Sequence, residues 1–283
     1  MSVRPRLTAA GSFVAALSLA AGVIAAPVAD AAGPRTIELK VARDVHIVGS
    51  DTVAAGFATF RISTEHREHS IQMLKLRGDY TLRQARSDLD RAFQGKLRAI
   101  KRVDTKILWL GGATATPEHD GLFAETLYSG TYILLDVEGA GLTRLHVTDA
   151  SVGAGAHAVE ATVTATTGAK RDNVFRTDPA SLPRKGWMLF RNRAAEPHFM
   201  LLQQVARSTT RKDIRNFIDS GAQGDPKWIR DGFTQTGTIS PDTQIYVHLH
   251  LPAGRYLLTC FWPSISEGMP HFFMGMYKLV DLK

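Results

Sequence analysis

Hydrophobic and polar residues alternate most regularly near position 245. Ile245, Val247 and Leu249 occupy every second position, and His248 and His250 fall on the other side of the alternation. Because successive side chains of a strand point to opposite faces, this pattern predicts a strand with one apolar and one polar face.

Turn residues and the density of apolar residues predict further strands. A Pro-Ala-Gly turn at 252–254 precedes an apolar run over 256–262, and the last strand is expected over 277–282. Apolar segments at 71–76 and 199–205 each follow a histidine and also favour strands. Strands therefore dominate the expected structure.

Two short helices are expected between these strands. Thr81 can cap the start of one helix, and Thr209 or Thr210 can cap the other. Gly95 and Gly221 are placed to end them. The apolar residues that share one helical face are Leu82, Ala85, Leu89 and Phe93 in the first helix, and Ile214, Phe217 and Ile218 in the second.

The chain also matches itself. The segment 56–61 resembles 186–191 at an offset of 130 residues, and His69 then matches His198 at an offset of 129. The later matches, at an offset of 124, pair Leu127, Gly130, Tyr132 and Leu134 with Leu251, Gly254, Tyr256 and Leu258. The order is kept and the gaps are small, so the sequence predicts two similar all-β sandwich domains, 32–150 and 151–283.

The first 31 residues have the pattern of an export signal. Arg4 and Arg6 form a basic start, 13–26 is an apolar or small-residue stretch, and 29–31 reads Ala-Asp-Ala. This pattern predicts a signal peptide over 1–31 and a secreted, extracellular or cell-wall-associated protein. The apolar run is too short for a membrane span, and no transmembrane segment is expected.

Composition narrows the function classes. With 44% hydrophobic and 22% charged residues among 283, the chain has ordinary globular usage. The formal net charge of +7 becomes +6 without Arg4, Arg6 and Asp30, which favours contact with an anionic cell-wall surface. The basic residues are scattered and the aromatic residues lie in apolar strands, so no nucleic-acid partner is expected. Hydrolase, zinc-protease and phosphate-loop signatures are absent from the sequence, so we expect no enzyme.

A single cysteine, Cys260, cannot form an internal disulfide. Three interpretations remain open for it: an intermolecular partner, a buried spectator, or a metal-binding thiol.

The second copy carries a set of motifs that resembles one family. They are Phe190-Arg191-Asn192, Glu196-Pro197-His198-Phe199, Gly254-Arg255-Tyr256, Cys260, and a segment from Pro270-His271 to Met276. This set resembles the cupredoxins, Greek-key β-sandwich copper proteins of the plastocyanin and azurin type. The resemblance implies copper as cofactor, with His198, Cys260, His271 and Met276 as its ligands. Sulfur ligands favour Cu(I), and imidazoles suit both oxidation states.

The first copy keeps less of this pattern. Cys260 aligns with Asp136, the segment 138–141 replaces the later ligand loop, and only His69 keeps its place. The resemblance therefore implies a first domain without copper ligands.

Each residue also has a plainer interpretation. His198 alone could be a buried histidine at a strand edge, and Met274 and Met276 could be core or surface sulfur. The residues Met269, His271, Met274 and Met276 together would also suit a looser Cu(I) carrier site. The pair His248 and His250 reads as exposed strand histidines, and 118–120 as a polar turn.

These features predict an exported copper-binding cupredoxin-like protein that acts in electron transfer or copper handling. Its partner would be a redox protein or a copper donor or acceptor. The alternative is a metal-free extracellular binding or structural module on the same scaffold. The two are distinguished by whether the four candidate ligands lie within about 2–3 Å of one point.

Overall fold

The fold is described by a computed structural model that covers residues 35–283, except 140, 152–154, 170–171 and 225. The predicted signal peptide, 1–31, lies outside the described residues. Within the described residues, no helix is long and apolar enough to cross a membrane.

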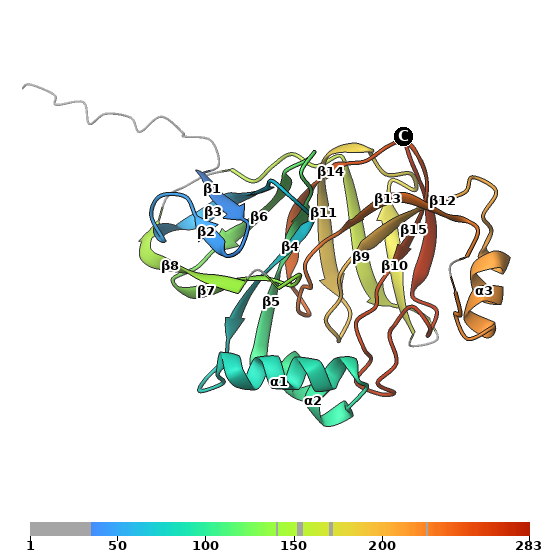
Figure 1. Cartoon of the computed structure of the whole chain (residues 1–283), viewed down its shortest axis with the longest axis horizontal. Helices are drawn as coiled ribbons and strands as arrows, with labels where there is room; N and C mark the ends of the chain where they lie inside the picture. The colour runs from blue at the N-terminus through green and yellow to red at the C-terminus, as the bar shows by residue number, and fades with distance from the viewer. Residues whose placement is uncertain (1–34, 140, 152–154, 170–171, 225) are drawn as a thin grey trace, which may run out of the picture. The chain divides into compact units, whose positions relative to one another are not determined.

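Strands make up most of the described chain, as the sequence predicted (Figure 1). In the first half they are β1 (Arg35–Val41), β2 (Val45–Ile47), β3 (Thr52–Thr64), β4 (His69–Leu76), β5 (Ile107–Ala115), β6 (Gly121–Leu127), β7 (Gly130–Asp136) and β8 (Gly141–Ser151). In the second half they are β9 (Ala161–Thr167), β10 (Asn173–Asp178), β11 (Lys185–Arg193), β12 (Leu201–Val205), β13 (Ile229–Gln235), β14 (Gln244–His250), β15 (Gly254–Thr259) and β16 (Tyr277–Leu282).

These strands form two sheets. The larger one has twelve strands in the order β10-β9-β11-β14-β6-β3-β8-β7-β4-β5, with β1 and β2 attached through β3. The smaller one has the order β13-β12-β15-β16. The larger sheet runs through both halves of the sequence because β14 pairs with β6 at Tyr246–Ala124 and Val247–Phe123.

The apolar faces of the strands form the core. Phe60 and Phe123 are fully buried and stack with their ring centroids 4.6 Å apart. The alternation around position 245 is realised as predicted, since Ile245, Val247 and Leu249 are all buried. The prediction of an all-β, cupredoxin-like sandwich is confirmed.

Both predicted helices are present. The helix α1 (Leu82–Phe93) starts at Thr81, whose hydroxyl accepts from the Gln84 N–H, while the Gln84 side chain accepts from the Thr81 N–H. The helix α3 (Arg211–Asp219) starts at Thr210 with the same reciprocal arrangement. These capping boxes satisfy backbone N–H groups that a helix start otherwise leaves unpaired.

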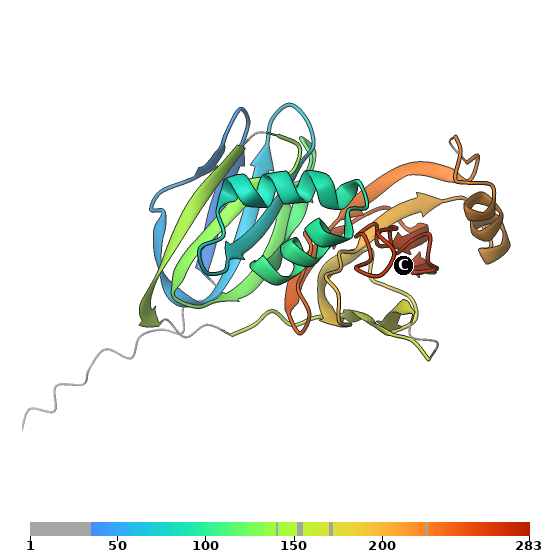
Figure 2. The same ribbon diagram turned by 90° about the horizontal axis from the view of Figure 1, so that it is seen from below.

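One helix was not expected. The helix α2 (Leu97–Lys106) directly follows α1 and packs beside it (Figure 2). Lys96 makes no side-chain capping bond at its start, so the usual sequence signal is missing. Gly95, with φ at +75°, lets the chain reverse between the two helices.

The strand predicted over 256–262 is shorter in the structure. Strand β15 ends at Thr259, and Cys260 lies just beyond it. There the chain stops pairing with β16, and the carbonyls of Cys260 and Trp262 accept from Phe272 and His271. The change of partner places the thiol at the strand end.

The internal repeat and the division into 32–150 and 151–283 stay predictions. The capped helices at Thr81 and Thr210, 129 residues apart, agree with the repeat.

Candidate metal centre

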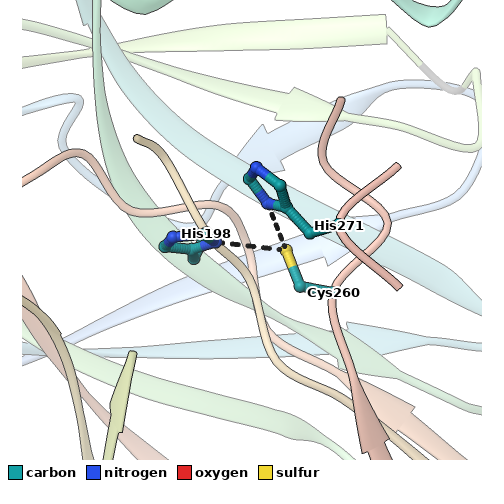
Figure 3. A group of neighbouring side chains, drawn as sticks. All are labelled: His198, Cys260 and His271. Carbon is teal, nitrogen blue, oxygen red and sulfur yellow. Dashed lines mark hydrogen bonds between the residues drawn. The ribbon is translucent and has the colours of Figure 1, made fainter. Parts of the chain in front are cut away.

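Three of the four predicted ligands converge in the structure. The Cys260 Sγ lies 3.5 Å from His198 Nδ1 and 3.8 Å from His271 Nδ1, and the candidate ligand atoms all lie within 4.8 Å of one another. Figure 3 shows both imidazole rings next to the sulfur. All three side chains are at most 1% exposed, so the group is closed to solvent.

His198 follows the end of β11 in the chain and is held by backbone pairing with Ile239. Its N–H donates to the Ile239 carbonyl at 3.0 Å, and the Ile239 N–H donates back at 2.8 Å. The buried amide of Asn192 donates to the carbonyls of Glu196 and Ile239. The motif Asn192 to His198 therefore acts as a fixed support that leaves the His198 ring little freedom.

Ten residues separate Cys260 from His271, and the chain closes this long segment on itself. The Ser264 N–H donates to the Met269 carbonyl at 2.9 Å, and Pro263 and Pro270 face each other across a bridge. Residues 263–270 thus form a side excursion. The His271 N–H then donates to the Trp262 carbonyl at 3.0 Å, which returns the imidazole to the thiol.

The excursion packs against the turn between α1 and α2. Gly268 has φ at +73°, and a Cβ there would lie 2.5 Å from the Gly95 carbonyl oxygen. Only glycine combines this backbone conformation with so close an approach.

A carboxylate orients the second imidazole. Glu196 Oε2 lies 2.7 Å from His271 Nε2 and accepts from the Ile265 N–H at 3.3 Å. A carboxylate accepts a hydrogen bond, so we assign the ring proton to Nε2, and the Nδ1 lone pair then faces Cys260. The motif Glu196-Pro197-His198 was noted in the sequence, but no role was assigned to its glutamate.

His198 carries a nitrogen without a partner. Within the described part of the chain, its buried Nε2 has no hydrogen-bond partner. Burial, followed by the neighbouring His271, lowers the pKa of His198 well below its usual value, so the ring is neutral near pH 7. Among the described residues, the ring therefore has one polar contact, from Nδ1 to the sulfur. This is typical of a metal ligand, whereas both nitrogens of a structural core histidine are usually hydrogen-bonded.

Burial raises the pKa of the Cys260 thiol to about 12, and the charge of Glu196 acts in the same direction. Hydrogen bonds from the backbone of Phe199 and Trp262 work against this rise. The thiol is therefore protonated in the metal-free protein, and a cation that binds here has to displace that proton.

The group fits a thiophilic metal ion. A triangle with sides of 3.5, 3.8 and at most 4.8 Å has a centre about 2.4 Å or less from each corner, close to the ~2.0–2.3 Å of metal–imidazole and metal–thiolate bonds. Two imidazoles and one thiolate form the His₂Cys donor set that suits copper.

Met276, the fourth predicted ligand, is buried and follows His271 by five residues in the sequence. Its N–H donates to the His271 carbonyl at 2.9 Å, and Gly275, with φ at +99°, completes the tight turn between them. Its role as a ligand stays a prediction.

The first half places a different pair at the matching residues. His69 Nδ1 lies 3.1 Å from Asp136 Oδ2, and both residues are buried. The alignment of Cys260 with Asp136 thus corresponds to an imidazole–carboxylate pair in place of an imidazole–thiol pair. A carboxylate is a hard ligand and does not supply the soft sulfur that Cu(I) prefers.

No protein-family model and no curated protein matches the chain. Among solved structures, auracyanin A, a blue copper protein from Chloroflexus aurantiacus, is 19% identical and covers 41% of this chain and 100% of its own, with a TM-score of 0.31. A copper nitrite reductase from Nitrosomonas europaea is 11% identical and covers 88% of this chain and 93% of its own, with a TM-score of 0.25. A multicopper oxidase is 8% identical, with 88% of both chains covered and a TM-score of 0.24.

One prediction has to be corrected at this point. The sequence led us to expect no enzyme, but the similar structures include a nitrite reductase and a multicopper oxidase, which are enzymes. The expectation rested on absent hydrolase, protease and phosphate-loop signatures and on reading His248 and His250 as plain exposed strand histidines. Neither observation excludes a copper enzyme, so the expectation was wrong. At these identities and TM-scores the likeness assigns no reaction to this chain.

The strands paired into two sheets and the buried His198–Cys260–His271 group agree with the resemblance seen in the sequence. The described chain has a cupredoxin-like β-sandwich fold with a His-Cys-His group that can hold a metal ion.

Proposed function

We propose that this protein binds one copper ion through His198, Cys260 and His271, with Met276 as a further ligand, and that it serves in electron transfer. The convergence of one thiol and two imidazoles at a buried point supports the proposal. The partners of Cys260 are 62 and 11 residues away in the sequence, so the fold, rather than local chain geometry, assembles the group.

The residues around the group suit an ion that changes charge by one electron. Copper in a His₂Cys site exchanges one electron between Cu(I) and Cu(II). The three side chains are supported by backbone hydrogen bonds and by Glu196, and they exclude water through their burial. Because these hydrogen bonds fix the three side chains, the ligands would move little when the copper ion changes its oxidation state.

A copper titration of the full chain beside a Cys260→Ser variant tests the proposal. We expect one equivalent of Cu²⁺ to give an intense thiolate-to-copper absorption band that is absent from the variant. The chain has one cysteine, so the loss identifies the ligand. Circular dichroism confirms that the variant is folded. Absence of the band from the unmodified chain, with no copper retained in either oxidation state, would favour the metal-free module.

The proposed role of Met276 as a further ligand is tested with a matched pair of variants. Met276 is buried, whereas Met274, two residues earlier, is 37% exposed. The reduction potential is sensitive to the axial ligand. Met276→Leu should therefore shift the potential, and Met274→Leu should leave it within error of the unmodified protein. Equal shifts in both variants would remove Met276 from the ligand set.

Copper handling is a second candidate because two thioethers near the group are exposed. Met269 and Met274 are 43% and 37% exposed in the segment that carries His271. Exposed thioethers can bind Cu(I) weakly on its way to or from a donor protein. Stoichiometric Cu(I) binding without the thiolate band, weakened by Met269→Leu and Met274→Leu, would favour this role.

We also propose export, and a redox protein as the partner. The basic and apolar pattern of residues 1–31 supports export, and the +6 charge of the remainder supports contact with an anionic cell-wall surface. N-terminal sequencing of protein recovered outside the cell should begin near Ala32. Release from cell walls by salt would support the electrostatic contact.

A further inference from the structure

A second group of histidines shares no residue with the Cys260 group and lies near the place where β14 pairs with β6, which joins the two halves of the sequence. His119 belongs to the turn between β5 and β6, and His248 and His250 belong to β14. Together they border a hollow of about 280 Å³. Its lining residues are Pro117, Glu118, His119, Asp120, Leu122, His248 and His250. The strand histidines and the polar turn, noted separately in the sequence, thus belong to one place.

His119 and His250 contact each other directly. Their ring centroids lie 4.2 Å apart with the rings inclined by 72°. Both residues are exposed, so the edges of the rings are open to an ion from solvent. Two imidazoles at this separation provide the two nitrogen ligands of a surface metal site with only small side-chain rotations.

Both residues stand on well-defined backbone. The Thr116 N–H donates to the His119 carbonyl at 2.9 Å, and the His119 N–H donates back at 3.2 Å, which closes the turn. His250 pairs with Lys185 in the register between β14 and β11. The pairing of β14 with β6 brings the turn and the strand together. The backbone pairing of the sheet therefore positions His119 and His250 next to each other.

His248 extends the group along the strand. It lies on the same face of β14 as His250, about 7 Å away along the strand. Its ring packs edge-on against Trp187 with centroids 5.4 Å apart, and it is half-buried. The carboxylate of Asp120 borders the same hollow, where Arg61 holds it at 2.6 Å.

The surroundings of His248 and His250 lower their pKa values, which favours the neutral imidazole that a metal ligand needs. Burial, then His119 and the nearby Lys185 and Arg184, lower the pKa of His250. Burial, then His250 and Lys185, lower the pKa of His248, while Glu160 acts in the opposite direction.

We propose that His119 and His250, with His248 beside them, form a second metal site that takes a divalent transition-metal ion. Imidazole ligands without sulfur suit borderline divalent ions, and among these Cu²⁺ binds most tightly to a given nitrogen site. The site differs from the Cys260 group in its ligands and in its exposure. It does not depend on the proposed function of that group.

Cu²⁺ titration of the full chain tests this site, because the two kinds of copper differ spectroscopically. Copper on imidazoles alone gives only weak visible absorption, and electron paramagnetic resonance reports its nitrogen ligands. We expect one equivalent of Cu²⁺ to bind to imidazole ligands alone. The affinity for this Cu²⁺ should fall at least tenfold in His119→Ala and in His250→Ala. His46→Ala, at an exposed histidine of strand β2, is the matched control and should change nothing.

The outcomes separate this site from the proposed copper centre. Imidazole-bound copper that persists in Cys260→Ser, and that both alanine variants weaken, supports the second site whether or not a thiolate band exists. Equal affinity in the unmodified chain, His119→Ala and His250→Ala would overturn it. So would an equal loss in the His46→Ala control, since binding would then be spread over surface histidines.

Discussion

Glu196 is the residue that sets the direction of the His271 ring. Its carboxylate lies 2.7 Å from Nε2, on the side of the ring away from Cys260. We predict that Glu196→Gln raises the reduction potential of bound copper, because a nearby negative charge stabilises Cu(II) more than Cu(I). Copper affinity should fall about tenfold or more, as is usual when the support of a ligand is removed. Potentiometry and copper competition measure the two effects.

Glu267→Gln provides the control for this prediction. Glu267 is an exposed carboxylate in the same 263–270 excursion, so its variant removes the same charge without touching the ring. If both variants give the same potential as the unmodified protein, Glu196 does not act on the metal through His271.

At the scale of residues, the sequence predicted the ligands better than their support. His198, Cys260 and His271 carry motif signals, and the structure brings them together. The role of Glu196 depends on a loop that brings His271, 75 residues later in the sequence, next to its carboxylate. No local sequence pattern predicts that contact. The contact between His119 and His250 depends on strand pairing in the same way.

Among the elements, the 263–270 excursion decides whether Cys260 and His271 can meet. We predict that Gly268→Ala destabilises the protein by about 2 kcal/mol or more, because a Cβ meets the Gly95 carbonyl oxygen in addition to the strain at positive φ. Gly78→Ala isolates the strain, since Gly78 has φ at +62° and open space around it. Its cost should be about 1 kcal/mol.

Urea denaturation of the two glycine variants measures these costs. Equal losses of unfolding free energy would mean that the 263–270 excursion can move away from the α1–α2 turn at no further cost. A larger loss in Gly268→Ala would show that the fold requires this close approach.

Prediction of the elements from sequence worked where local signals are strong. The capping threonines marked α1 and α3, and strict alternation marked β14. Helix α2 begins without a side-chain cap, and it was missed although Ala99, Ile100 and Val103 form a buried face. The end of β15 is set by hydrogen bonds to residues 271 and 272, so tertiary contacts rather than apolar density end that strand.

For the whole molecule, Gln72 joins the two halves of the sequence inside the core. It is 4% exposed, and its amide donates to the carbonyls of Gly111 and Thr238 at 3.1 Å, while its oxygen accepts from the Thr238 N–H at 2.6 Å. The Gly237 N–H also donates to the Gly112 carbonyl at 3.0 Å. The segment around 238 therefore lies along β5 of the other half.

We predict that the described chain unfolds in one cooperative transition and that Gln72→Leu lowers its stability by about 2–4 kcal/mol. The variant keeps the volume of the side chain but leaves the buried Thr238 N–H without its acceptor, and an unsatisfied buried group is costly. Gln94→Leu, at the exposed end of α1, should stay within about 0.5 kcal/mol. Calorimetry and urea denaturation measure both variants. Two separated transitions in the unmodified protein would contradict the prediction, and they would mean that the halves, despite their shared sheet and the Gln72 bonds, are independent folding units.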